Sequence, residues 1–292
     1  MSKSLMFLCF ILAGCATVKP ASVMATGPEW LTAPGEPPSL QGRHVVFVAG
    51  FLSELIPGYF TDNVAVTREL GAQTSTLFPP SSRGLADDVA LIEQEISRSP
   101  SPLVLVGHSK GGAGVLLTVL QHPELILLGR VECVIVLQGA IGGSPLADGL
   151  TKVKLLRGPG LNSMTTERSH TLFKSAMETV TADLSASERA FFFSRIFYVR
   201  SAHRQSALAA ELALTELILR PGGESDGLLP PAEMKLEDGG VDLGVLDADH
   251  AGLTVSSFLS VTTPSERRAF TTALYREVGR RLGWARTARS EF

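Results

Sequence analysis

The stretch that most constrains the fold of this chain is residues 103–112, where an apolar run passes into a serine bracketed by glycines. Residues 103–106 are all Leu or Val, as in a strand buried on both faces, and a helix-like segment follows at 110–121. Ser109 lies between them, inside a Gly-x-Ser-x-Gly pentapeptide. A sharp turn from strand to helix lifts such a serine above the sheet, and the glycines leave room for neighbouring backbone. The pattern predicts a nucleophilic serine, and the alternative is a serine that only caps the helix.

Strand and helix patterns alternate on both sides of this stretch. We expect further strands at 44–49, 73–78, 131–137, 196–200 and 241–246, and further helices at 85–96, 166–180, 206–219 and 264–282. This alternation predicts an α/β fold with a doubly wound, mostly parallel sheet, whose ligand site lies at the carboxyl ends of the strands. Strand patterns lapse at about 143–192, and we expect a helical cap inserted over that edge.

The first 14 residues have the pattern of an export signal. Lys3 precedes an apolar run at 5–13 that is too short to span a bilayer, and the run ends in Leu-Ala-Gly-Cys. This ending resembles a bacterial lipoprotein signal peptide, which implies cleavage before Cys15 and lipidation of its thiol. Because Ala16 and not aspartate follows Cys15, the resemblance implies the outer membrane. An ordinary secretory signal peptide is the alternative, and both interpretations export the protein.

Residues 15–42 are rich in Pro, Ala and Thr, and we expect a tether that holds a domain at 43–292 away from the membrane. Trp30 and Leu31, within this segment, could dock on the domain or on the membrane. Cys133 is the only cysteine after Cys15, so no disulfide framework is possible, and we expect it to be a buried strand residue.

The charge distribution argues against a nucleic-acid partner. The formal net charge is −3, and the arginines form no basic face outside the C-terminal end. The sequence does not indicate an oligomeric state.

A serine hydroxyl needs a histidine to take its proton and a carboxylate to orient that histidine. Two segments after later strands supply them. Asp226 lies in Glu-Ser-Asp-Gly-Leu-Leu-Pro at 224–230, and His250 follows the last strand. Asp247 and Asp249 remain alternative acids, and His203 remains an alternative base.

Lys110 offers a different partner for the serine, a Ser–Lys dyad. Adjacent residues on a helix point about 100° apart, which disfavours this arrangement. The charge of Lys110 could instead attract an anionic substrate or be solvated.

Taken together, these motifs resemble the α/β-hydrolase superfamily, and more narrowly its lipases and esterases, over about residues 44–285. The resemblance implies that Ser109 is the nucleophile, Asp226 the acid and His250 the base. It also implies that the backbone amides of Phe51 and Lys110 form the oxyanion hole.

The resemblance implies a serine hydrolase that cleaves carboxylic esters, in particular acyl or lipid esters, through an acyl-enzyme and without a cofactor. Many secreted bacterial lipases of this family hold calcium with a carboxylate two residues beyond the base. Gly252 occupies that position here, which argues against a calcium requirement. The alternatives are an acyltransferase with the same triad and a non-catalytic envelope protein that uses the fold as a scaffold.

Overall fold

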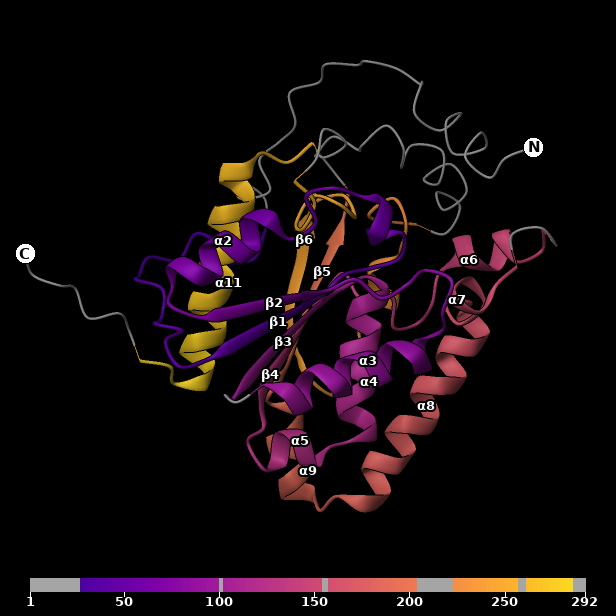
Figure 1. Cartoon of the computed structure of the whole chain (residues 1–292), viewed down its shortest axis with the longest axis horizontal. Helices are drawn as coiled ribbons and strands as arrows, with labels where there is room; N and C mark the ends of the chain where they lie inside the picture. The colour runs from indigo at the N-terminus through magenta and orange to yellow at the C-terminus, as the bar shows by residue number, and fades with distance from the viewer. Residues whose placement is uncertain (1–26, 100–101, 154–156, 204–222, 257–260, 286–292) are drawn as a thin grey trace, which may run out of the picture.

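Six parallel strands form the centre of the structure (Figure 1), a computed structural model that describes residues 27–99, 102–153, 157–203, 223–256 and 261–285. The strand order is β2-β1-β3-β4-β5-β6, and every neighbouring pair runs parallel. The bounds are β1 His44–Val48, β2 Gln73–Leu77, β3 Leu103–His108, β4 Val131–Leu137, β5 Ile196–Ala202 and β6 Val241–Asp247. The predicted parallel sheet is confirmed, with every expected strand present.

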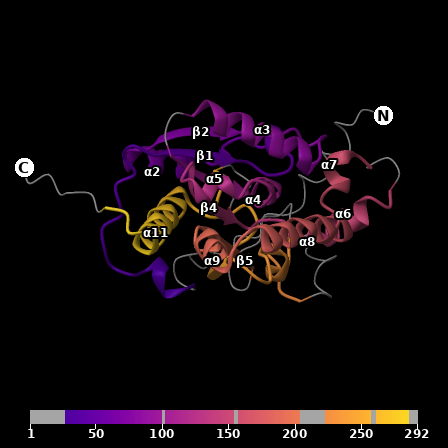
Figure 2. The same cartoon turned by 90° about the horizontal axis from the view of Figure 1, so that it is seen from below.

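Helices cover both faces of this sheet (Figures 1 and 2). On one face lie α2 (Thr61–Glu69) and α11 (Pro264–Leu282), and on the other lie α3 (Leu85–Arg98), α4 (Lys110–Gln121), α5 (Glu124–Leu127), α8 (Thr166–Asp183) and α9 (Ala186–Phe193). Successive side chains of a strand alternate between the faces of the sheet. Val45 and Phe47 therefore pack in the core on the α2 and α11 face, and Val46 and Val48 pack in the core on the α3 and α4 face. No helix in the described part of the chain is both long enough and apolar enough to cross a bilayer.

The limits of helix α11 could be predicted closely because local residues mark both of its ends. At its start the side chain of Thr263 accepts a hydrogen bond from the Glu266 amide, and the Glu266 carboxylate accepts one from the Thr263 amide. Pro264 occupies the first helical position, and Gly283 ends the helix with φ +70°. The helix predicted at 206–219 lies outside the described residues.

The segment predicted as a cap also includes α6 (Pro145–Leu150) and α7 (Pro159–Asn162). Helix α6 follows the carboxyl end of β4, where Asp148 accepts a hydrogen bond of 2.9 Å from the Thr166 amide at the start of α8. Helix α8 buries Phe173 and Val180 in the core beside α4. The helical content is as expected, and the role of 143–192 as a cap stays a prediction.

The N-terminal boundary of the domain differs from the expected one. Trp30 and Leu31, in the short η1 helix (Glu29–Leu31), are buried against α11. Leu40, beyond them, is buried in the same core. The Trp30 indole N–H donates to the carbonyl of Leu243, at 2.7 Å. The prediction of a tether over the whole of 15–42 is therefore wrong for its second half, because these apolar side chains complete the core. Cys15 and the signal segment lie outside the described residues.

Replacing Trp30 with alanine tests this boundary. We expect the free energy of unfolding to fall by about 3 kcal/mol, because the change removes a buried aromatic ring and its hydrogen bond. Urea denaturation followed by circular dichroism measures the loss. A change below about 1 kcal/mol, typical of surface substitutions, would show that this segment is not part of the stable domain.

Candidate active site

Ser109 occupies the sharp turn between β3 and α4, as predicted. Its backbone has φ 57° and ψ −125°, a strained conformation for a residue with a side chain. The glycines are required by close packing: a Cβ on Gly107 would lie 2.4 Å from the Gly111 carbonyl oxygen, and one on Gly111 would lie 2.2 Å from that of Val48. The Ser109 amide donates to the Leu137 carbonyl at 3.1 Å, which fixes the turn against the end of β4.

The loop after β1 lies directly against this turn. A Cβ on Gly50 would lie 2.8 Å from the Cβ of Ser109. Phe51 and Lys110, whose amides the sequence analysis assigns to the oxyanion hole, each follow one of these two residues. The strands concerned, β1 and β3, flank the point where the strand order reverses, and ligands bind in open α/β sheets at such a point.

The loop that carries Phe51 is held by three hydrogen bonds to one serine. Ser81 accepts a hydrogen bond from the Leu52 amide, and its hydroxyl and amide donate to the Glu54 carboxylate at 2.8 and 3.0 Å. Leu52 has φ 61°, so this loop, like the Ser109 turn, has a constrained backbone. The loop that carries the predicted oxyanion amide of Phe51 is therefore held by Ser81, a residue that no sequence motif marks.

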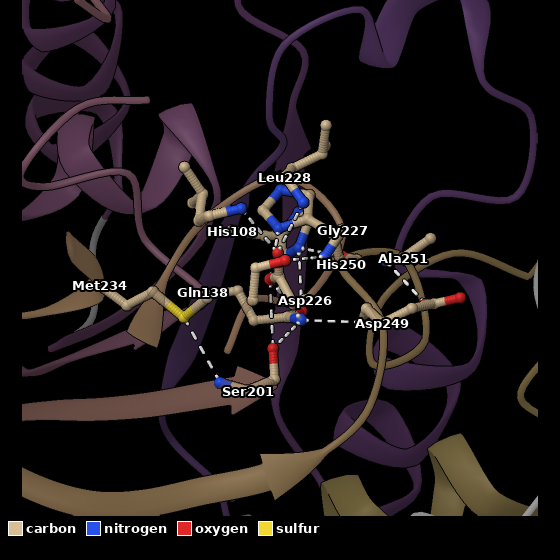
Figure 3. Close-up of polar contacts among 12 residues, drawn as sticks. His108, Gln138, Ser201, Asp226, Gly227, Leu228, Met234, Asp249, His250 and Ala251 are labelled. Carbon is tan, nitrogen blue, oxygen red and sulfur yellow. Dashed lines mark hydrogen bonds and ion pairs between the residues drawn. The ribbon is translucent and has the colours of Figure 1, made fainter. Parts of the chain in front are cut away.

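Asp226 and His250 meet in the loops after β5 and β6 (Figure 3). Both are buried, and His250 Nδ1 donates to Asp226 Oδ2 at 2.7 Å. The His250 amide also donates to the Asp226 carbonyl at 2.8 Å, so the two turns are joined by backbone as well. The other carboxylate oxygen accepts the amides of Leu228 and Leu229 at 3.0 and 2.8 Å. The structure thus brings together the predicted acid and base.

The rival residues hold other positions. Asp249 Oδ1 accepts a hydrogen bond from the Ala251 amide within its own turn, at 3.0 Å. Asp247 ends strand β6 and is buried. The backbone amide of His203 donates to the Ser225 carbonyl, which places His203 beside the loop of the acid.

The second ring nitrogen of His250, Nε2, is buried and makes no hydrogen bond to Ser109 or to any other described residue. The ring of His108, which directly precedes Ser109, lies 4.8 Å from the ring of His250 between centroids. A histidine whose Nδ1 is held by a carboxylate and whose Nε2 is unoccupied is arranged to take a proton from a hydroxyl group.

Two residues that no sequence motif marks, Gln138 and Ser201, contact the carboxylate of Asp226. Gln138 Nε2 and the Ser201 hydroxyl both donate to Asp226 Oδ2, each at 3.2 Å (Figure 3). Gln138 directly follows β4 and has φ 48°, so it too is strained. The available signal was a polar residue at the carboxyl end of a predicted strand. The described residues contain no group of three or more His, Cys, Asp or Glu side chains arranged to hold a metal ion.

The side chain of Lys110 forms an ion pair with Asp88 of α3. It is buried, with its Nζ 2.7 Å from Asp88 Oδ2 and donating to the Arg83 carbonyl at 2.9 Å. Burial raises the pKa of Asp88 to about 6, and the ammonium group opposes this rise. The expectation that the Lys110 charge attracts an anionic substrate or is solvated is therefore wrong.

Comparison with known proteins gives matches among solved structures. No protein-family model matches the chain, and no curated protein sequence matches it. The structure of the metagenomic carboxyl esterase MGS0156 is 24% identical, with a TM-score of 0.66 over 84% of this chain and 77% of that one. The mature Bacillus licheniformis lipase BlEst2 is 20% identical, with a TM-score of 0.53 over 75% and 86%. At these identities the similarity concerns the fold.

Proposed function

We propose that this chain, which has the α/β-hydrolase fold, hydrolyses carboxylic esters with Ser109 as its nucleophile. The observation that carries the proposal is the buried Asp226–His250 pair, whose His250 Nε2 is unoccupied at the sheet edge where the Ser109 turn lies. The names of the similar structures, a carboxyl esterase and a lipase, agree with this reaction class.

In the proposed mechanism, His250 Nε2 takes the proton of Ser109 while the serine oxygen attacks the ester carbonyl. Asp226 stabilises the imidazolium that forms, and the amides of Phe51 and Lys110 donate to the oxyanion, each supplying about 3 kcal/mol. When the tetrahedral intermediate collapses, the bond between the acyl carbon and the alkoxy oxygen breaks, and the imidazolium protonates that oxygen so that the alcohol leaves. Water, activated by the same histidine, hydrolyses the acyl-enzyme and restores Ser109.

The proposed location and substrate class rest on the sequence. The Leu-Ala-Gly-Cys ending at 12–15 supports a lipid on Cys15 and therefore an exported, membrane-attached enzyme, with the outer membrane as its location. An enzyme held at a membrane surface meets acyl esters of lipids, which we propose as the substrate class.

Labelling with a fluorophosphonate probe tests the proposed function. We expect the wild-type protein to be labelled and to hydrolyse a chromogenic short-chain ester, and we expect Ser109→Ala to do neither while keeping its circular dichroism spectrum. Ser97→Ala, on the surface of α3, serves as the matched control and should behave as wild type. Absence of labelling in folded wild-type protein would instead favour the scaffold alternative. Product analysis with an added acceptor alcohol separates hydrolysis from acyl transfer.

A further inference from the structure

A chain of hydrogen bonds connects the oxyanion loop to the base through two residues that the mechanism does not use, Tyr59 and His108. The Gly50 amide donates to the Tyr59 hydroxyl oxygen at 3.0 Å, and that oxygen lies 2.5 Å from His108 Nδ1. On the other side of the ring, His108 Nε2 lies 2.8 Å from the His250 carbonyl oxygen. Both side chains are buried. One imidazole therefore spans the distance between the loop of Phe51 and the turn of His250.

The carbonyl end of this chain determines where the protons lie. A backbone carbonyl can only accept, so His108 Nε2 carries a hydrogen toward His250. A neutral histidine with its hydrogen on Nε2 has an acceptor at Nδ1, so the Tyr59 hydroxyl donates to that atom. A backbone amide can only donate, and the Tyr59 oxygen can accept from Gly50 while it donates to His108. The Tyr59 end is therefore compatible with the tautomer that the carbonyl end assigns.

Gln138 extends this chain of hydrogen bonds to Asp226, and its donors and acceptors agree with the assignment at His108 (Figure 3). Its Nε2 faces the Asp249 carbonyl oxygen at 2.8 Å and the Asp226 carboxylate at 3.2 Å, and both of these groups accept. Its Oε1 therefore faces His108 Nε2, at 3.1 Å, and accepts from it. The amide orientation of Gln138 agrees with the tautomer of His108.

His108 is also kept without charge. Burial holds the pKa of its imidazole well below the ordinary value, and the positive charge that His250 can carry lowers this pKa further. The titratable groups that face it are Tyr59, His250 and, through Gln138, Asp226. A charged His108 would oppose the imidazolium that the proposed mechanism forms on His250, since the two rings lie 4.8 Å apart.

We propose that His108 is a positioning residue, a neutral histidine with its hydrogen on Nε2 that fixes the oxyanion loop relative to the base. Its effect on catalysis rests on the proposed function, whereas its tautomer and charge do not. Tyr59 helps to orient the ring, because its hydroxyl group donates to Nδ1.

Nitrogen NMR of the full chain, labelled with ¹⁵N-histidine, tests the tautomer. From pH 5 to pH 8 we expect His108 to show an unprotonated Nδ1 and a protonated Nε2, identified by loss of these signals in His108→Gln. In Tyr59→Phe we expect the hydrogen to stay on Nε2, because the His250 carbonyl and Gln138 Oε1 still accept it. Only the Nδ1 signal should shift, because Nδ1 loses its donor. A His108 that titrates in this pH range, or whose Nε2 is unprotonated, would overturn the proposal.

Kinetics test the positioning role. His108→Leu can make neither hydrogen bond, and we expect it to lower kcat by about 10- to 100-fold, the size of effect caused by small misplacements, with KM changed less than about twofold. His108→Gln keeps an acceptor and a donor and should recover most of this loss. His122→Leu, at a half-exposed histidine just after the C-terminal end of α4, is the control. Unchanged kcat in His108→Leu, or equal losses in the Leu and Gln variants, contradicts the proposal.

If wild-type protein resists the fluorophosphonate, the proposed function fails, and the NMR experiment still decides the state of His108.

Discussion

Replacing His250 with alanine is expected to lower kcat for ester hydrolysis by about 10⁴- to 10⁶-fold, because Ser109 then has no base. Asp226 would keep its four other hydrogen bonds, from Gln138, Ser201, Leu228 and Leu229, so the carboxylate stays satisfied and the fold should persist. Steady-state kinetics with a chromogenic ester and the rate of fluorophosphonate labelling measure the loss. Both rates report on the nucleophilicity of Ser109, and KM should change little.

The matched control for this experiment is His203→Ala. His203 is the rival base that the sequence leaves open, and it lies beside the loop of the acid through its bond to Ser225. Because the Asp226 carboxylate is bonded to His250, we expect His203→Ala to keep kcat within about twofold of wild type, a change of less than about 0.5 kcal/mol. The reverse result, a large loss in His203→Ala with His250→Ala active, would reassign the base.

The fold could be predicted because its signals are local. A strand buried on both faces must be apolar throughout, as residues 103–106 are, and the capping box at Thr263 and Glu266 marks the start of α11. The docking of Trp30 on the domain stayed open in the sequence, because the surrounding prolines have the composition of a tether. Its burial depends on residues more than 200 positions away, such as Leu243 on β6 and Arg276 on α11, which no local pattern reveals.

The candidate site also has residues that local motifs predict and contacts that depend on the tertiary structure. Turn motifs in a set order predict Ser109, Asp226 and His250 as a triad, and in the structure Asp226 is hydrogen-bonded to His250. The contacts of His108 and Gln138 could not, because they depend on how the ends of separate strands meet across the sheet edge. A histidine before the nucleophile looks the same in sequence whether it packs passively or spans two loops.

The ion pair of Lys110 with Asp88 could not be predicted from the sequence either, because it joins two separate helices. Its loss has a large predicted effect. We expect Lys110→Met to lower the free energy of unfolding by about 3–5 kcal/mol at pH 8, because it leaves the buried Asp88 carboxylate without its countercharge. Both side chains are almost fully enclosed, with exposures of 2% and 1%, so water cannot replace the lost partner. Urea denaturation at fixed pH measures the change.

The pH dependence of this loss identifies its cause. Because the folded pKa of Asp88, about 6, lies above its ordinary value of 3.8, the folded state binds the proton more tightly. The contribution of Asp88 to wild-type stability therefore falls as pH rises from about 4 to about 6. Without Lys110 this pKa rises further, since the opposing ammonium is gone. The deficit of Lys110→Met should accordingly shrink between pH 8 and pH 5, as Asp88 takes up a proton.

A double variant separates the buried charge from the lost packing of the lysine side chain. Asp88→Leu with Lys110→Met removes both charges and keeps apolar volume, so we expect stability within about 1 kcal/mol of wild type, or above it, because both desolvation costs disappear. It should also lack the fall in stability between pH 4 and pH 6 that Asp88 contributes. If the double variant is as unstable as Lys110→Met at pH 8, the packing of the lysine side chain, and not its charge, is what stabilises this part of the structure.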